Sequence, residues 1–416
     1  MRIIDIKSIY NRNKTIVANF GYLSVFQVIN LLIPLVTYPY LIRKLGIEIY
    51  GAIIFSQAII SYFVILINFG FNFSATKQIS INRDNESKLL EIINAVFTIK
   101  TALLLLSFII LFLILNFLPD HHLYKTLYII TMWMALYECF FPIWYFQGIE
   151  KMKYITILTL ISRSIFVILI FILVNKPTDY LLVPIINGIG AIASSTIALI
   201  IIYRKNKFYV PKLFKLIEII NESIFIFISN VSTKLYVSAS KTIIGFYLGN
   251  TQVAYFDLGE KLLQFLKIPV MILGQSTFPK LSKTKNIKLA NKLLKISIIG
   301  SSIVLLIVLL FLKKIILLIG GVDMLPAQKV AGILVFSIIF VASNAFLVPY
   351  RLIPFGYNKD FAKVTFYSFC TYLLFIVILI LFDSISITNL SVSNLIVEFV
   401  VLILGVFYSR KRDILY

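Results

Sequence analysis

Residues 45–57 read LGIEIYGAIIFSQ, and residues 248–260, which lie 203 positions later, read LGNTQVAYFDLGE. Leu-Gly opens both segments, and Tyr50-Gly51 corresponds to Val253-Ala254. The same offset joins Lys77 to Lys280. Similar segments at a constant spacing indicate an internal repeat. We therefore expect a duplicated chain whose halves are residues 1–208 and 209–416.

The composition excludes a water-soluble protein. The chain has 416 residues, of which 60% are hydrophobic and 14% are charged, and its mean hydropathy is +0.96. Soluble domains are about 45–50% apolar and about 25% charged. Since about 20 apolar residues cross a bilayer once, this length leaves room for about a dozen spans. The sequence therefore predicts a polytopic membrane protein and excludes secreted, nuclear and cytosolic soluble proteins.

Apolar runs separated by charged residues predict an all-α fold with twelve transmembrane helices. The connection over residues 313–330 is the least defined of the loops. The predicted spans are 16–41, 50–70, 92–117, 124–146, 154–174, 179–203, 222–248, 252–275, 293–312, 328–350, 361–382 and 386–408. Together with the repeat, they indicate two six-helix bundles in the same orientation. Transporters built from parallel repeats bind substrate between the halves.

The net charge of +21 lies mostly in the loops. With a cytoplasmic N-terminus, 26 lysines and arginines fall on the cytoplasmic side and 7 on the other. Cytoplasmic loops of membrane proteins carry such an excess of Lys and Arg. We therefore expect both termini in the cytoplasm. The basic loops fit anionic lipid headgroups, so the charge does not imply nucleic acid.

Polar side chains inside the predicted spans mark a candidate site. A lysine at the centre of a bilayer costs about 2.5–3.5 kcal/mol on insertion scales, so its presence implies a role. In the seventh and eighth spans, helical spacing groups such residues on single faces, with Lys261 beside the second group. These residues are Asn230, Lys234, Ser238 and Lys241 in the seventh span, and Asp257, Glu260, Lys261, Gln264 and Lys267 in the eighth.

Two interpretations of these charges remain open. In the first, Lys234, Lys241 and Arg163 line a water-filled cationic cavity that binds an anionic headgroup. In the second, the charges pair with one another and only fix the packing. Asp257 and Lys261 are four residues apart and can pair along one helix.

Other polar or helix-bending residues have less specific roles. Glu138 and Glu398 are candidates for proton relay or cation binding, or for partners of buried bases. Lys100 and Lys267 lie nearer span ends, where their amines are expected to reach the interface. Pro34 and Pro39 should kink or break the first helix.

The sequence carries no signature of an enzyme. Cys139 and Cys370 lie in apolar runs, which argues against disulfide and zinc sites. No G-x-x-x-x-G-K-[ST] motif is present. The predicted external loops are short, unlike those expected of a polysaccharide polymerase or ligase. We therefore expect no catalytic residues, no metal and no cofactor.

Several motifs resemble the Wzx O-antigen flippases of the multidrug/oligosaccharidyl-lipid/polysaccharide exporter superfamily. In the first third these are Asn19-Phe20-Gly21-Tyr22-Leu23, Gln27, Asn30, Pro34-Leu35, Pro39-Tyr40-Leu41, Arg43-Lys44-Leu45-Gly46, Tyr50-Gly51 and Asn68-Phe69-Gly70-Phe71. After the fourth span, residues 141–148 (FPIWYFQG) with Glu150-Lys151-Met152 resemble a further family motif. Weaker similarity extends to Leu248-Gly249 and Phe278-Pro279.

The resemblance implies a fold, a substrate and a location. The fold would be two six-helix bundles in a V around a central cationic cavity. The substrate would be an undecaprenyl-pyrophosphate-linked oligosaccharide that moves from the cytoplasmic to the periplasmic leaflet of the bacterial inner membrane. Polysaccharide polymerase and chain-length proteins would be partners, besides the lipid bilayer.

The resemblance also implies roles for the candidate residues. The pyrophosphate would be bound by Lys234, Lys241, Arg163 and Lys261, and the sugars by Asn230, Ser238, Gln264 and Gln57. Ion or proton coupling would involve Asp257, Glu260, Glu138 and Glu398, and Pro34 and Pro39 would act as a hinge. The alternatives are an exporter of drugs or of another anionic lipid on the same scaffold and, with less support, a polymerase or ligase.

Overall fold

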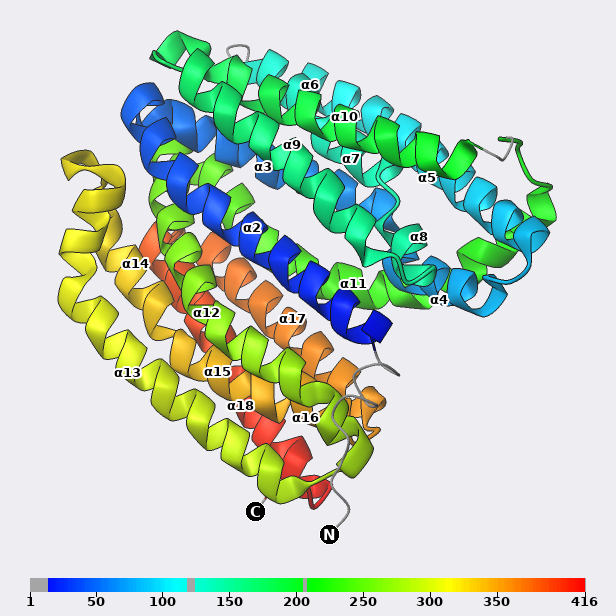
Figure 1. Ribbon diagram of the computed structural model, residues 1–416. Coiled ribbons are helices and arrows are strands. Elements are labelled where there is room, and N and C mark those ends of the chain that lie inside the picture. Colours follow the sequence, from blue (N-terminus) through cyan, green and yellow to red (C-terminus); the bar gives the residue numbers. More distant parts are fainter. Residues whose placement is uncertain (1–13, 118–123, 205–207, 416) are drawn as a thin grey trace. The chain divides into compact units, whose positions relative to one another are not determined.

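The structure is a computed structural model that describes residues 14–117, 124–204 and 208–415. Within these ranges it does not describe the side chains of some residues, among them Asn230 and Lys234. Every regular element in the described ranges is a helix (Figure 1). The expected all-α fold is therefore confirmed.

The helices of the first half begin with α2 and end with α10. Their bounds are α2 Lys14–Leu45, α3 Ile47–Asn68, α4 Phe71–Asn82, α5 Glu86–Phe117, α6 Lys125–Thr131, α7 Trp133–Phe140, α8 Ile143–Gly148, α9 Met152–Leu173, η2 Pro177–Leu181 and α10 Leu182–Tyr203. Those of the second half are α11 Leu213–Leu248, α12 Asn250–Thr284, α13 Ile287–Gly320, η3 Val322–Met324, α14 Ala327–Phe336, α15 Ile338–Leu347, α16 Pro349–Leu352, α17 Asn358–Leu381 and α18 Ile387–Lys411.

A helix, or a run of broken helices, covers each of the twelve predicted spans. In the described part of the chain, nine of these stretches are long and apolar enough to cross a membrane. The other three, α2, α11 and α12, contain 32, 36 and 35 residues. At about 1.5 Å per residue, each exceeds the roughly 30 Å of a bilayer core. The chain is a multi-pass α-helical membrane protein.

The repeat found in the sequence reappears in the backbone. Gly46 has φ +83° and Gly249 has φ +86°, a region that glycine enters without steric cost. Each glycine separates two long helices, and the helix after it begins in the same way. The amide of Tyr50 donates to the Gly46 carbonyl at 3.1 Å, and that of Val253 donates to the Gly249 carbonyl at 3.3 Å.

Later elements repeat as well. The side chain of Asn85 accepts from the Lys88 amide at 3.1 Å before α5, and that of Asn286 accepts from the Leu289 amide at 2.9 Å before α13. Such caps satisfy free amides at a helix start. The fourth and tenth spans are each broken into three pieces, α6–α8 and α14–α16.

The structure differs from three local predictions. The second span ends at Asn68, and Phe69 and Gly70 have positive φ before α4 begins, whereas the equivalent α12 is continuous. The uncertain region 313–330 is mostly helical, because α13 continues to Gly320. α2 runs unbroken through Pro34 and Pro39, so the helix is not broken there. A kink or hinge at these prolines stays a prediction.

Packing divides the chain into two units. Unit 1 comprises Met1–Leu45 and Ser56–Val231, and unit 2 comprises Gly46–Phe55 and Ser232–Tyr416. The chain therefore passes between units three times, at Gly46 between α2 and α3, within α3 and within α11. The halves 1–208 and 209–416, which follow sequence equivalence, stay a prediction.

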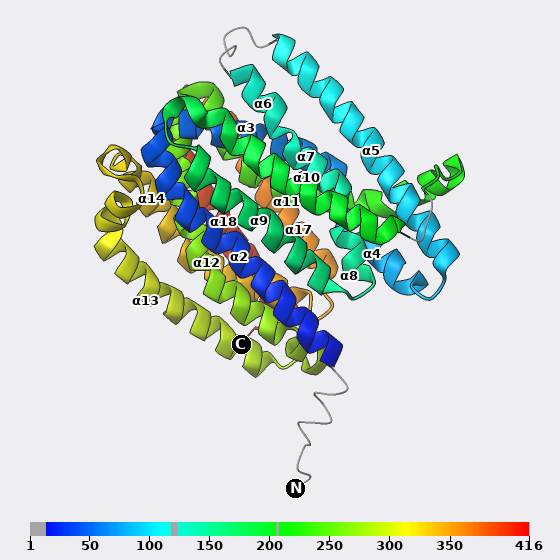
Figure 2. The same cartoon turned by 45° about the horizontal axis from the view of Figure 1, so that its top comes forward.

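Equivalent helix pairs form the core of each unit. In unit 1, α9 packs on α2 and α10, and α10 also packs on α7 (Figure 2). In unit 2, α17 packs on α18, which also packs on α15. The fully buried Trp144 belongs to a hydrophobic cluster of unit 1 that also contains Phe71, Val96 and Phe97.

Candidate functional site

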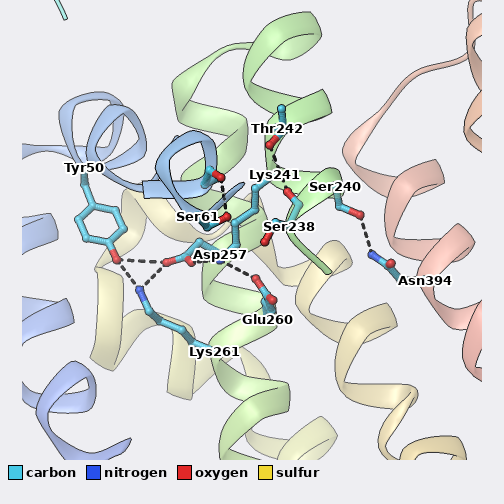
Figure 3. Close-up of polar contacts among 11 residues, drawn as sticks. Tyr50, Ser61, Ser238, Ser240, Lys241, Thr242, Asp257, Glu260, Lys261 and Asn394 are labelled. Atoms are coloured by element: carbon cyan, nitrogen blue, oxygen red, sulfur yellow. Dashed lines mark hydrogen bonds and ion pairs between the residues drawn. The ribbon is translucent and has the colours of Figure 1, made fainter. Parts of the chain in front are cut away.

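Unit 2 contains a network of ionisable side chains from three helices (Figure 3). Lys241 of α11 lies between two carboxylates of α12, 2.7 Å from Asp257 Oδ1 and 2.6 Å from Glu260 Oε2. Asp257 Oδ2 accepts from Lys261 Nζ at 2.5 Å. Tyr50 of α3 joins from the third helix, since its hydroxyl lies 3.1 Å from Asp257 Oδ2 and 2.5 Å from Lys261 Nζ.

The network balances its own charge. It contains two lysines and two carboxylates, and the side chain of Asp257 at its centre is 2% exposed. Burial strengthens the attraction between these charges, and each loses its hydration in return. The pairing of Asp257 with Lys261 that the helical spacing indicated is confirmed. The predicted role of Lys241 and Lys261 in binding substrate stays a prediction.

Tyr50 is the member of the network that sequence reasoning missed. It lies in the short segment Gly46–Phe55 that packs with unit 2. A Cβ on Gly51 would lie 1.9 Å from the carbonyl oxygen of Asn250, so only glycine permits this approach of α3 to α12. Gly51 is the residue of the sequence that could have indicated this contact. A glycine there allows the close approach that brings the phenol of Tyr50 to Asp257.

The other candidates of the seventh and eighth spans whose side chains the structure describes lie outside this network. Ser238 is half-buried, and its backbone carbonyl accepts from the Thr242 hydroxyl at 3.2 Å. Gln264 is exposed. The side chains of Asn230 and Lys234 lie outside the described residues. A contact that was not anticipated joins the Ser240 hydroxyl to Asn394 at 3.1 Å and to Tyr372 at 2.8 Å.

Arg163 lies in unit 1, beside a pocket of about 190 Å³. Its Nε donates to Asn30 Oδ1 at 3.3 Å and its Nη1 to Asn187 Oδ1 at 3.5 Å. Among the described residues, no carboxylate forms an ion pair with this guanidinium. The pocket is lined by Val64, Trp133, Met134, Tyr137, Glu138, Thr159, Ser162, Arg163, Asn187 and Ala191. Arg163 and the two lysines of the network are thus placed in different units.

Glu138 has two partners in the same unit. Its Oε1 accepts from Lys100 Nζ at 2.9 Å and from Asn68 Nδ2 at 2.8 Å. Lys100 is fully buried and also donates to the Glu138 carbonyl at 2.7 Å. The expectation that Lys100 extends to the membrane interface is therefore wrong, because a carboxylate compensates the charge where it lies.

The remaining candidates are half-buried, one in each unit. Glu398 Oε2 accepts from Asn344 Nδ2 at 2.8 Å, and the same amide group donates to the Glu398 carbonyl at 2.9 Å. Gln57 lies in the part of α3 that belongs to unit 1. Within the described ranges, no group of His, Cys, Asp and Glu side chains is arranged to hold a metal ion.

Arg351 falls between the predicted spans 328–350 and 361–382, and the structure buries it. Arg351 is fully buried, and its guanidinium donates to the Phe346 carbonyl at 3.0 Å and to the Ile414 carbonyl at 2.8 Å. Nearby, Arg412 Nε donates to Asp360 Oδ2 at 2.7 Å, and this hydrogen bond raises the pKa of Arg412. These two arginines attach the C-terminal residues to α15 and α17. The contacts of Arg351 with Ile414 and of Arg412 with Asp360 span 63 and 52 residues, so sequence spacing did not reveal them.

Comparison with known families decides the class of protein. The family described as "Polysaccharide biosynthesis protein" matches residues 16–285, which is more than half of the chain. The chain belongs to this family. A polysaccharide biosynthesis protein with this composition acts at a membrane, as the many apolar helices require. The resemblance to polysaccharide exporters seen in the sequence is confirmed.

Two relatives of this chain are described as O-antigen transporters. The chain is 29% identical over 368 residues to a "Putative O-antigen transporter" of Escherichia coli (strain K12), covering 85% of this chain and 88% of that one. A protein of the same description from Shigella dysenteriae is 31% identical over 270 residues, covering 64% and 67% of the two chains. Both relatives are described as transporters and not as enzymes.

Solved structures show the same fold. The structure described as "Lipid II flippase MurJ, inward closed conformation" superposes with a TM-score of 0.75 at 15% identity, covering 95% of this chain and 87% of the other. An inward-facing multidrug resistance MATE family transporter of the MOP superfamily superposes with a TM-score of 0.65 at 13% identity, covering 92% and 98%. The polysaccharide biosynthesis protein therefore has the fold of this transporter superfamily.

Proposed function

We propose that this protein is a flippase for lipid-linked oligosaccharides. The substrate is an undecaprenyl-pyrophosphate-linked repeat unit of O-antigen or a similar glycan, and it moves from the cytoplasmic to the periplasmic leaflet. The observation that carries the proposal is the family match over residues 16–285 in a chain with a flippase-like fold. An O-antigen transporter description of the relatives supports the substrate class.

Alternating access fits a chain built from parallel repeats. The lipid diphosphate enters from the cytoplasmic leaflet, and the polyprenyl tail stays in lipid. Cationic residues bind the anionic group, as lysine and arginine bind phosphates. The candidates are Lys234, Lys241, Lys261 and Arg163. Asn230, Ser238, Gln264 and Gln57 are candidates for hydrogen bonds to sugars.

The ion pairs of unit 2 suggest how binding and coupling are linked. Lys241 and Lys261 are held by Asp257 and Glu260, so an anionic group has to displace a carboxylate before either lysine can bind it. A displaced buried carboxylate is unstable as an anion and favours uptake of a proton or cation. Asp257 and Glu260 are therefore the first candidates for coupling. Glu138 and Glu398, whose partners are Lys100 and Asn344, come second.

The proposed location is the bacterial inner membrane, with both termini in the cytoplasm. There the protein receives its substrate after assembly on the cytoplasmic leaflet. Polysaccharide polymerase and chain-length proteins, which would use the translocated glycan, are proposed partners. Transport without covalent change to the glycan requires no catalytic residue and no cofactor.

Complementation tests this function. The chain is expressed in a strain that lacks its O-antigen flippase, or in a host that carries the cognate polysaccharide gene cluster. Restored surface polysaccharide is expected for the wild type. Lys234→Ala and Lys241→Ala should lose most of it at normal protein level, because a cationic partner of the diphosphate is lost.

The control is Arg83→Gln. Arg83 is an exposed arginine that pairs with Glu150 at 3.3 Å, outside the proposed site, and the variant should retain activity. Failure of the wild type in the cognate host would overturn the flippase function. Drug resistance conferred by that same wild type would instead support the exporter alternative. Full activity of both lysine variants would show that these lysines are structural.

A further inference from the structure

Among the residues whose side chains the structure describes, the pocket beside Arg163 in unit 1 has hydrogen-bond donors without partners and one charge without a counter-ion. We propose that it is a subsite for one acidic sugar residue, whose carboxylate binds the Arg163 guanidinium. The inference rests on the proposed function and deepens it, because it specifies a substrate glycan that contains a uronic acid. Under this inference Arg163, named above as a candidate for the diphosphate, binds the glycan instead, and the three lysines remain the candidates for the diphosphate.

The pocket is rich in hydrogen-bond donors. A guanidinium has five N–H groups, and with the described residues Arg163 forms two hydrogen bonds, of 3.3 and 3.5 Å, to uncharged amide oxygens. The indole Nε1 of Trp133 is buried and has no hydrogen-bond partner among the described residues. Both side chains line the same pocket. A buried donor without a partner costs about 1–3 kcal/mol, so the pocket favours a ligand rich in acceptors.

The charge of the pocket selects a carboxylate. Glu138 also lines it, but the fully buried Lys100 lies 2.9 Å from Glu138 Oε1 and cancels its charge. Arg163 then contributes one net positive charge. A uronic acid carries one negative charge and presents two oxygens that a guanidinium can bind in parallel. A diphosphate carries more negative charge than this pocket compensates.

The size and the walls fit one sugar ring. The volume of about 190 Å³ is below the about 300–1,000 Å³ of pockets for drug-sized ligands, so the pocket suits a smaller ligand. Trp133 and Tyr137 supply aromatic surface for the apolar face of a ring. Thr159, Ser162 and Asn187 supply hydroxyl and amide groups for its hydroxyls. The pocket therefore combines the apolar and polar surfaces that a monosaccharide presents.

Binding to the purified full-length protein in detergent tests the inference. The chain contains two tryptophans, and Trp144 is buried in the core, so a ligand in the pocket should change mainly the emission of Trp133. The probes are methyl glucuronide, neutral methyl glucoside, methyl N-acetylglucosaminide and inorganic pyrophosphate. We expect saturable binding of the glucuronide, with a Kd at least tenfold lower than those of the other three.

Variants assign the preference to the guanidinium. Arg163→Gln should abolish the difference between glucuronide and glucoside, and Arg163→Lys should keep part of it because the charge remains. Arg83→Gln, which changes an exposed arginine of the same unit, should bind as the wild type does. Thermal unfolding of each variant verifies that it is folded. If Arg163→Gln does not fold, the Arg163→Lys variant and the four-probe comparison on the wild type decide.

Equal affinity for glucuronide and a neutral glycoside would overturn the inference, and so would tighter binding of pyrophosphate. The outcome is separable from that of the proposed function. A wild type that restores surface polysaccharide and does not bind glucuronide would contradict only the acidic-sugar subsite. A wild type that binds glucuronide and fails in its cognate host would contradict only the flippase function.

Discussion

At the scale of single residues, Lys100 shows what a buried charge needs. Its side chain is fully buried and pairs with Glu138 at 2.9 Å. Breaking a buried ion pair on one side costs about 3–5 kcal/mol, because the other charge is left without a partner. Lys100→Met should therefore strongly lower the unfolding temperature of the purified protein. The double variant Lys100→Met/Glu138→Gln should recover much of that loss, as measured by thermal unfolding in detergent.

Residue-scale reasoning from the sequence succeeded where partners lie on one helix. Asp257 and Lys261 are four residues apart, and their pairing followed from helical spacing alone. It failed for the contacts of Lys100 with Glu138 and of Arg351 with Ile414, which span 38 and 63 residues. Hydropathy gives the depth of a residue along its own span, and it contains no information on the helices that surround it. If Lys100→Met/Glu138→Gln is no more stable than Lys100→Met, the loss of stability in Lys100→Met does not come from the unpaired charge of Glu138.

At the scale of elements, one glycine controls how α3 meets α12. A Cβ at Gly51 would lie 1.9 Å from the Asn250 carbonyl oxygen, so Gly51→Ala forces the two backbones apart. Because Tyr50 precedes it, the variant should both destabilise the protein and weaken the contact of Tyr50 with Asp257. Gly300→Ala is the matched control, since a Cβ there has no atom within 4 Å. It removes a flexible residue from helix α13 and should leave stability unchanged or raise it by up to about 1 kcal/mol.

The sequence predicted the elements well because their main determinants are local. Apolar runs located the spans, and the repeat predicted equivalent helix starts at Gly46 and Gly249. The breaks in the fourth and tenth spans were not predicted, because apolar residues continue through them. Unfolding temperatures of Gly51→Ala and Gly300→Ala that fall by the same amount would contradict the close approach of α3 and α12.

At the scale of the whole molecule, the distribution of basic residues predicts the orientation in the membrane. A cytoplasmic N-terminus and twelve spans place 26 lysines and arginines inside and 7 outside. Lys176 and Lys283 are both exposed and lie on opposite sides in this topology. In a variant without Cys139 and Cys370, Lys176→Cys should react with a membrane-impermeant maleimide once only the outer membrane has been permeabilised. Lys283→Cys should react only after the inner membrane is opened as well.

The reverse pattern would place the basic loops in the periplasm, where the substrate could not enter beside them from the cytoplasmic leaflet. Labelling of both positions from one side would contradict the number of spans between them, and with it the alternation on which the proposed direction of transport depends.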